Sequence, residues 1–169
     1  MHNATASSWG LPAADLSMKI AYYCLPLALF SITTLPLQAA AQSCQQATKQ
    51  QALDLFEQWN DSLKSGDPQQ VARLYQEDAL LLPTVSKKPR LTEQERVDYF
   101  SQFLADKPSG KLDTHYFDAA CNTATLAGLY TFDFAATGKQ VAARYSFTYR
   151  WDGQQWLISH HHSSLLPSG

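Results

Sequence analysis

Polar and apolar residues alternate along two stretches near the end of the chain, 141–151 and 155–164. An alternation with period two predicts β-strands, because successive side chains of a strand point to opposite faces of the sheet. Asp152-Gly153 between the stretches predicts a type I′ turn, in which both central residues have positive φ. We therefore predict a β-hairpin whose second strand contains three consecutive histidines, 160–162.

The two faces of the first predicted strand differ in chemistry. One face carries Ala143, Tyr145, Phe147, Tyr149 and Trp151, and the other carries Arg144, Ser146, Thr148 and Arg150. We predict that the face with Arg144 lines an interior pocket, and that the paired strand brings His161 beside it. The aromatic face is then too apolar to be left in water, so we expect it to bind a second copy of the chain.

Three helices are predicted before the hairpin. Apolar residues at three- and four-residue spacing indicate a helix over about 47–64, and Asp67-Pro68 begins a short second one. Thr92 and Glu95 form a capping box that begins a third helix, which ends before Pro108. Further strands are predicted over residues 79–82, 111–120 and 123–135. Helices followed by strands are typical of an α+β fold, and a sheet curled around the helices would form a cone with a cavity.

The order of these elements and several motifs resemble the nuclear transport factor 2-like superfamily. The motifs are N-D-S-L-K-S-G-D-P, A-L-L-L-P, A-R-Y-S-F-T-Y, W-D-G-Q-Q-W-L-I and H-H-S-S-L-L-P. Within it, the chain is most similar to bacterial exported proteins related to the calcium/calmodulin-dependent protein kinase II association domain. The resemblance implies an α+β cone, with three N-terminal helices packed in a strongly curved, mostly antiparallel sheet. It also implies a pocket between the sheet and the first helix, and oligomers that assemble through the outer face of the sheet.

No kinase activity follows from this resemblance. The sequence has no glycine-rich phosphate loop, no strand lysine with a helix glutamate partner, and no H-R-D or D-F-G segment. The formal net charge of −2 also argues against nucleic acid as a partner.

Residues 1–41 predict a secretory signal peptide. Met18-Lys19 is followed by the apolar run 20–37 and by three alanines, 39–41. Residues 1–17 contain no Lys or Arg, so we interpret them as a start-site artefact. Cleavage after Ala41 would leave residues 42–169 as a single domain in the periplasm or outside the cell, without stable membrane insertion. An uncleaved membrane anchor and a lipoprotein acylated at Cys44 are the alternatives.

Two cysteines remain after this cleavage, Cys44 and Cys121. In an exported chain they most simply form one disulfide, which would join the amino terminus to a strand end. Two unpaired thiols are the alternative.

A set of polar and aromatic residues is predicted to line the pocket. These are Trp59, Tyr130, Arg144, Ser146, His161 and Ser163. The related animal domains place arginines where this chain has Tyr130, Ser146 and Ser163, so Arg144 is expected to supply a replacement cation. A buried ion pair of Arg144 with Asp54 or Glu57 is the structural alternative. We expect no metal and no cofactor, because consecutive strand histidines point to opposite faces and cannot all reach one ion.

These residues predict an exported, oligomeric, non-kinase protein whose pocket binds a small acidic or carbonyl-bearing molecule. The alternative comes from the same superfamily resemblance, which includes ketosteroid isomerase and the polyketide cyclases. In that case proton transfer would take place in the pocket, with His161, Tyr130 and Arg144 as the catalytic candidates.

Overall fold

The structure is a computed structural model that describes residues 44–167 of the 169-residue chain. Its helical elements are α1 (Lys49–Lys64), α2 (Pro68–Ala72), α3 (Glu93–Phe103) and the short 3-10 helix η1 (Leu104–Asp106). Its strands are β1 (Tyr75–Leu82), β2 (Pro108–Ala120), β3 (Thr123–Phe134), β4 (Lys139–Trp151) and β5 (Trp156–Leu165). The predicted signal peptide, residues 1–41, lies outside the described residues. Within 44–167 no helix is long and apolar enough to cross a membrane.

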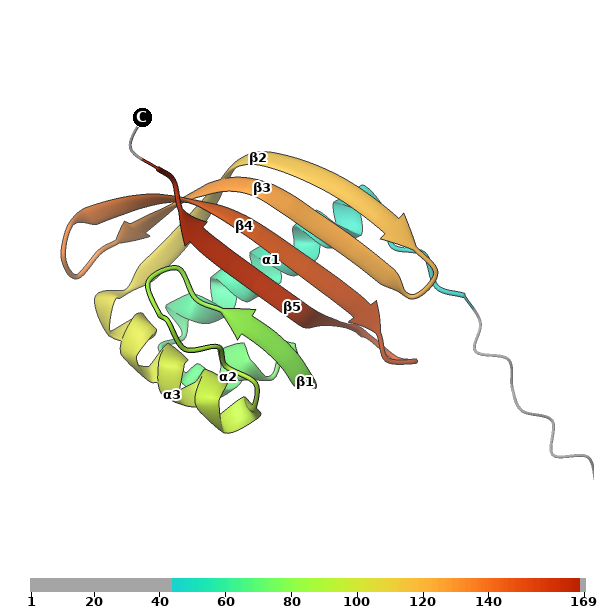
Figure 1. Ribbon diagram of the computed structural model, residues 1–169, viewed down its shortest axis with the longest axis horizontal. Coiled ribbons are helices and arrows are strands. Elements are labelled where there is room, and N and C mark those ends of the chain that lie inside the picture. Colours follow the sequence, from blue (N-terminus) through green and yellow to red (C-terminus); the bar gives the residue numbers. More distant parts are fainter. Residues whose placement is uncertain (1–43, 168–169) are drawn as a thin grey trace, which may run out of the picture. The chain divides into compact units, whose positions relative to one another are not determined.

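The five strands form one sheet in the order β1-β5-β4-β3-β2. β1 runs parallel to β5, and the other neighbours are antiparallel. The sheet curves around α1, and α2 and α3 lie on the same side beneath β1 (Figure 1). The prediction of an α+β fold with three helices in a curved, mostly antiparallel sheet is confirmed.

The helices begin where the sequence indicates. The Thr92 hydroxyl accepts a hydrogen bond from the Glu95 amide, and the Glu95 carboxylate accepts one from the Thr92 amide, which is the predicted capping box. Asp67 caps α2 through the Gln69 amide, with Pro68 at the first helical position. α1 has a second capping box that the sequence reading missed, between Thr48 and Gln51.

The two faces of β4 are the reverse of the predicted ones. Tyr145, Phe147 and Tyr149 are almost completely buried, with exposed fractions of 2%, 0% and 1%. They face α1, where the Phe56 ring lies 5.8 Å from the Phe147 ring. Arg144 is exposed on the outer face of the sheet. The aromatic face is buried by the helix of its own chain, so the prediction that it binds a second copy is wrong.

A β-bulge at Ser159 interrupts the alternation of β5. Tyr149 pairs with Ile158, whereas the adjacent Thr148 pairs with His160, so Ser159 is an extra residue in the ladder. Its hydroxyl donates a hydrogen bond to the Thr148 carbonyl, at 3.0 Å. Because of this extra residue, both Ile158 and His161 are buried on the inner face.

The turn between β4 and β5 is not of type I′. Gly153 has a φ of 108°, but Asp152 is not among the described residues with positive φ. The Asp152 carboxylate instead accepts hydrogen bonds from the amides of Gln154 and Gln155, at 2.7 and 2.9 Å. A side-chain acceptor thus stabilises a longer loop, and only one residue needs the left-handed conformation.

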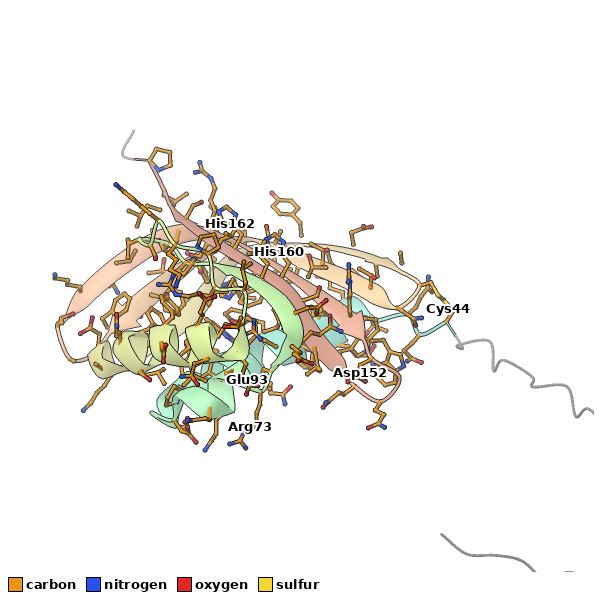
Figure 2. All side chains as sticks on the ribbon, turned by 60° about the horizontal axis from the view of Figure 1, so that its bottom comes forward. Cys44, Arg73, Glu93, Asp152, His160 and His162 are labelled. Carbon is orange, nitrogen blue, oxygen red and sulfur yellow. A yellow bond between two sulfur atoms is a disulfide. The ribbon has the colours of Figure 1, made fainter. Side chains whose placement is uncertain are left out.

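Cys44 and Cys121 form the predicted disulfide, with their Cα atoms 5.1 Å apart. Figure 2 shows Cys44 at the end of the sheet near Asp152. Beside it, the Gln45 carbonyl accepts a hydrogen bond from the Asn122 amide, and the Gln45 amide donates one to the Asn122 side chain, both at 2.8 Å. The start of the domain is therefore fixed to the β2–β3 turn.

Buried polar side chains join the helices to the sheet. Asn60 of α1 donates to the Gly110 carbonyl at 2.8 Å and accepts from the Gly110 amide at 2.7 Å. Arg96 of α3 donates to the carbonyls of Gln76, Glu77 and Ala79 at the start of β1. The bonds of Asn60 satisfy the backbone of buried Gly110, and one bond of Arg96 satisfies the carbonyl of buried Ala79.

We predict that Asn60→Ala lowers the free energy of unfolding by about 2–4 kcal/mol, because it leaves the amide and the carbonyl of buried Gly110 unpaired. Urea unfolding at neutral pH measures the change. Asp61→Ala is the matched control, since Asp61 is exposed and pairs only with exposed Lys64, and a loss within about 0.5 kcal/mol is expected for it. Equal losses for the two variants would contradict the role of Asn60.

Candidate functional site

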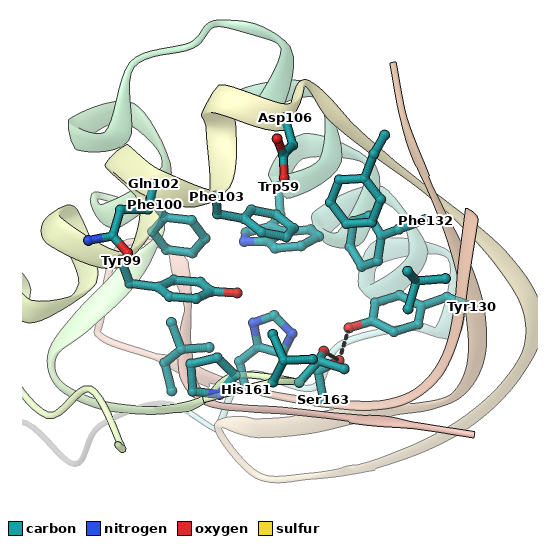
Figure 3. Close-up of a pocket in the computed structure, with 16 residues that line it drawn as sticks. Trp59, Tyr99, Phe100, Gln102, Phe103, Asp106, Tyr130, Phe132, His161 and Ser163 are labelled. Carbon is teal, nitrogen blue, oxygen red and sulfur yellow. Dashed lines mark hydrogen bonds between the residues drawn. The ribbon is translucent and has the colours of Figure 1, made fainter. Parts of the chain in front are cut away.

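A cavity of about 280 Å³ lies between the inner face of the sheet, α3 and the loop that follows β1. Its walls are mostly apolar and aromatic, as Figure 3 shows. It is lined by Trp59, Leu81, Pro83, Thr84, Val85, Tyr99, Phe100, Gln102, Phe103, Asp106, Tyr130, Phe132, Phe134, Val141, His161 and Ser163. The mouth is marked by the exposed residues Val85, Gln102 and Asp106.

Four polar residues of the cavity come from three different segments of the chain. Tyr130 lies on β3, His161 and Ser163 lie two residues apart on the inner face of β5, and Thr84 follows β1. The parallel pairing of β1 with β5 puts the loop after β1 beside the end of β5. The Ser159 bulge turns His161 and Ser163 inward.

Three hydroxyl groups form one cluster in the cavity. Tyr130 donates a hydrogen bond to the Ser163 oxygen at 2.5 Å, and the Ser163 and Thr84 hydroxyls are bonded to each other. Burial raises the pKa of Tyr130 well above its ordinary value, so the phenol is neutral. Ser163 is buried and Thr84 is half-buried.

His161 belongs to a second buried chain of polar groups. The Trp59 indole N–H donates to the Tyr75 hydroxyl at 3.0 Å, and this hydroxyl lies 2.8 Å from Nδ1 of His161. Nε2 of His161 is buried and has no partner among the described residues. Burial, with smaller contributions from His160 and His162, lowers the pKa of His161 to about 3. The imidazole is therefore neutral at neutral pH.

The cavity holds few charges. Asp106 is the one charged residue among those that line it, and it lies at the exposed mouth. Burial raises the pKa of Tyr99 to about 12, so its hydroxyl, which points into the cavity in Figure 3, is also neutral. The interior can thus offer hydrogen bonds to a ligand but no buried cation.

Comparison with known proteins identifies the family. Residues 48–167 match the model of the calcium/calmodulin dependent protein kinase II association domain. The chain belongs to this family. A protein of Xanthomonas campestris assigned to the same association domain is 39% identical, with 73% of this chain and 91% of that chain covered and a TM-score of 0.67. No curated protein matches the chain significantly.

Two more distant structures share the fold of this association-domain protein. One is the iota-carbonic anhydrase of a cyanobacterium in complex with bicarbonate, at 17% identity, with 73% of this chain and 94% of that chain covered and a TM-score of 0.63. The other is a nuclear transport factor 2-like protein with a cystatin-like fold from Novosphingobium aromaticivorans, at 16% identity, 69% and 80% coverage, and a TM-score of 0.58. At these identities the likeness shows the fold alone.

The structure brings together only part of the predicted pocket. Trp59, Tyr130, His161 and Ser163 line the cavity of the association domain. Arg144 and Ser146 do not, because β4 turns their side chains to the outer face, where they line a separate hollow with His162. The predicted convergence of Arg144 with Tyr130 and His161 is therefore wrong, as is the predicted role of Arg144 as an interior cation.

Thr84 and Tyr99 were missed by the sequence reading. Thr84 follows a proline in a loop, where nothing in the local pattern indicates a contact with Ser163 seventy-nine positions later. Tyr99 lies next to Phe100 on α3 and packs against Phe100 and Phe103. These two apolar neighbours were the only sign in the sequence that this side of the helix faces the interior. The bond of Tyr75 to His161 likewise depends on the β1–β5 pairing.

We predict that His161 makes the stability of the domain depend on pH. Its pKa of about 3 in the folded protein lies below the ordinary value of 6.5, so between these values the unfolded chain binds one more proton. The free energy of unfolding should therefore fall as the pH drops from 6.5 toward 3, by about 2 kcal/mol between pH 6.5 and pH 5. Urea unfolding at several pH values measures this loss.

His161→Phe should remove this part of the pH dependence. His115→Phe is the matched control, because His115 is exposed on β2, and it should keep the slope of the unchanged protein. An identical slope for the His161 variant would contradict the prediction.

Proposed function

We propose that this association-domain protein binds a small carbonyl- or carboxyl-bearing molecule in the cavity, and that it interconverts carbon dioxide and bicarbonate there. We further propose that it is exported, that it is not a kinase, and that it works as a homo-oligomer. The buried donor cluster of Tyr130, Ser163, Thr84 and His161 is the observation that carries the proposal.

The hydroxyl cluster has one hydrogen to offer a ligand. Three hydroxyls carry three hydrogens, and the bonds Tyr130–Ser163 and Ser163–Thr84 use two of them. The third is left on Ser163 or Thr84. A molecule with an oxygen acceptor would bind this hydrogen, and its other oxygens could reach the Tyr99 hydroxyl or the imidazole of His161.

The electrostatics of the cavity favour a neutral substrate. No lysine or arginine lines it, so a bound anion would lose its hydration without gaining a cation. Carbon dioxide is neutral and apolar and suits the aromatic walls. Bicarbonate, as the product, would be held only by neutral donors and could leave through the mouth. The cyanobacterial iota-carbonic anhydrase in complex with bicarbonate shows that a protein of this fold can hold such a ligand.

The proposed reaction is the addition of water to carbon dioxide. The water oxygen forms a bond to carbon while one carbon–oxygen π bond breaks, and its electron pair moves to that oxygen. Donors already placed in a largely apolar cavity stabilise the charge that develops there, because they need no reorganisation during the reaction. The proton released from the attacking water passes to solvent at the mouth.

We predict that the purified domain accelerates carbon dioxide hydration in a stopped-flow assay with a pH indicator. Ser163→Ala should lower kcat/KM by about a hundredfold, because it removes the centre of the donor cluster. Ser146→Ala is the matched control, since Ser146 lies on the outer face of β4, and it should keep full activity. Thermal melting of both variants checks that they are folded.

A domain without hydration activity would contradict the proposed reaction. The cavity volume would then favour the second candidate, because about 280 Å³ approaches the size of pockets that hold larger ligands. In that case a ketone or carboxylic acid with an apolar body should raise the melting temperature, and should do so less in Ser163→Ala. This candidate includes the proton-transfer chemistry of an isomerase or cyclase, although a buried histidine with a pKa of about 3 would be a weak base.

The proposals of export and oligomerisation have separate support. A disulfide between Cys44 and Cys121 is typical of oxidising compartments, and amino-terminal sequencing of the mature protein should begin at Gln42. The outer face of the sheet carries a cross-strand row of Tyr116, Ala127, Ser146 and His162. Small side chains beside a tyrosine that is 74% exposed suit contact with a second copy.

We predict that the domain sediments as a dimer or a larger oligomer at micromolar concentration, and that Tyr116→Glu shifts it toward the monomer by burying a charge in the contact. Leu91→Glu is the matched control. Leu91 is also an exposed apolar residue, but it lies in the loop before α3, and the variant should remain oligomeric. A monomeric unchanged protein would contradict assembly through this face.

A further inference from the structure

His161 is held by ring contacts that fix the direction of its two nitrogens. Its ring stacks on Phe147, with centroids 3.9 Å apart, and the Trp59 ring meets it edge-on at 5.2 Å. Nδ1 points to the Tyr75 hydroxyl, at 2.8 Å. Nε2 is buried without a partner among residues 44–167, and the residue lines the cavity.

The directions of two hydrogen bonds determine which nitrogen carries the proton. An indole nitrogen can only donate, so the Tyr75 oxygen accepts the bond from Trp59. The single hydrogen of the Tyr75 hydroxyl then goes to the nearby Nδ1, which must be unprotonated to accept it. A neutral imidazole with an unprotonated Nδ1 carries its hydrogen on Nε2. The opposite tautomer would leave the Tyr75 hydrogen without an acceptor in the core.

We propose that Trp59 and Tyr75 are positioning residues that hold His161 in the Nε2–H tautomer, so that His161 offers a hydrogen-bond donor, and not a base, to the oxygen of the bound molecule. This deepens the proposed function, on which its catalytic consequence rests. The Nε2–H group of His161 and the remaining hydroxyl hydrogen on Ser163 or Thr84 would then both donate to one oxygen-bearing ligand. His161 and Ser163 lie two residues apart on β5.

The surroundings of the ring support a neutral donor. The groups packed against it are Trp59 from α1, Tyr75 from β1 and Phe147 from β4, none of which is charged. Burial raises the pKa of Tyr75 well above its ordinary value, so Tyr75 keeps the hydrogen that it donates. The other titratable groups near the ring are His160 and His162 on β5 itself, and both lower its pKa.

The tautomer can be measured without any substrate. In protein with 15N-labelled histidine, protonated and unprotonated ring nitrogens have well-separated chemical shifts, and His161→Gln assigns the signals. At pH 7 we expect Nε2 of His161 to be protonated and Nδ1 to be unprotonated. The reverse pattern, or rapid exchange between the two forms, would overturn the proposal.

Tyr75→Phe tests the positioning role. It removes the hydrogen bond to Nδ1, so the 15N signals of His161 should move toward a mixture of tautomers, and kcat/KM for hydration should fall about tenfold or more. Tyr99→Phe is the matched control for the spectra. It removes a hydroxyl of the same cavity that is not bonded to His161, and it should leave the 15N pattern unchanged. An unchanged pattern in Tyr75→Phe would overturn the role of Tyr75.

The two proposals can fail separately. A domain with the Nε2–H tautomer but no hydration activity contradicts carbon dioxide as the substrate and leaves the donor role of His161 intact. Hydration activity with the opposite tautomer supports the substrate and overturns the donor role.

Discussion

Trp59 joins the core of this domain to its cavity. Its ring packs edge-on against Phe147 of β4 and His161 of β5, with centroids 5.1 and 5.2 Å away, and its N–H binds Tyr75 of β1. One side chain of α1 thus contacts three neighbouring strands of the sheet. The inner face of β4 is aromatic, and its burial against α1 contributes favourable free energy to the closed sheet. The position of the cavity, beside the Trp59 ring and under α3, follows from this packing.

The chemistry of the cavity is that of neutral groups held in place. Burial keeps Tyr75, Tyr130 and His161 uncharged at neutral pH. Neutral donors cost less to bury than an arginine, and they bind an oxygen acceptor without requiring it to carry a full charge. A site of this kind suits a reaction in which charge appears on an oxygen only during the chemical step. The proposed hydration of carbon dioxide has this property.

The chain does contain a buried arginine, but it is Arg96 and not Arg144. Arg96 is 1% exposed, and its Nη1 and Nη2 atoms donate to three backbone carbonyls near the start of β1, whereas its Nε has no partner among the described residues. The sequence offered a signal for this, because Arg96 lies four and seven positions before Phe100 and Phe103, on the apolar side of its helix. A buried guanidinium can be satisfied by carbonyl oxygens as well as by an anion, so an interior arginine does not by itself indicate an acidic ligand.

Local patterns in the sequence determined the α+β elements of this domain. The capping box of Thr92 and Glu95, the alternation of β4 and the pairing of Cys44 with Cys121 could all be read from the residues, because each depends on near neighbours or on simple chemistry. Only the tertiary structure decided which face of β4 is the inner one, since alternation defines two faces and the packing of α1 chooses between them. It also decided that His161 shares the inner face with Phe147 and Ile158 and not with Arg144, because the extra residue at Ser159 reverses the alternation of β5 and leaves no mark on the polarity of the strand. The contacts of Thr84 with Ser163 and of Tyr75 with His161 join positions about eighty residues apart, and such contacts follow from the β1–β5 pairing and not from any local pattern.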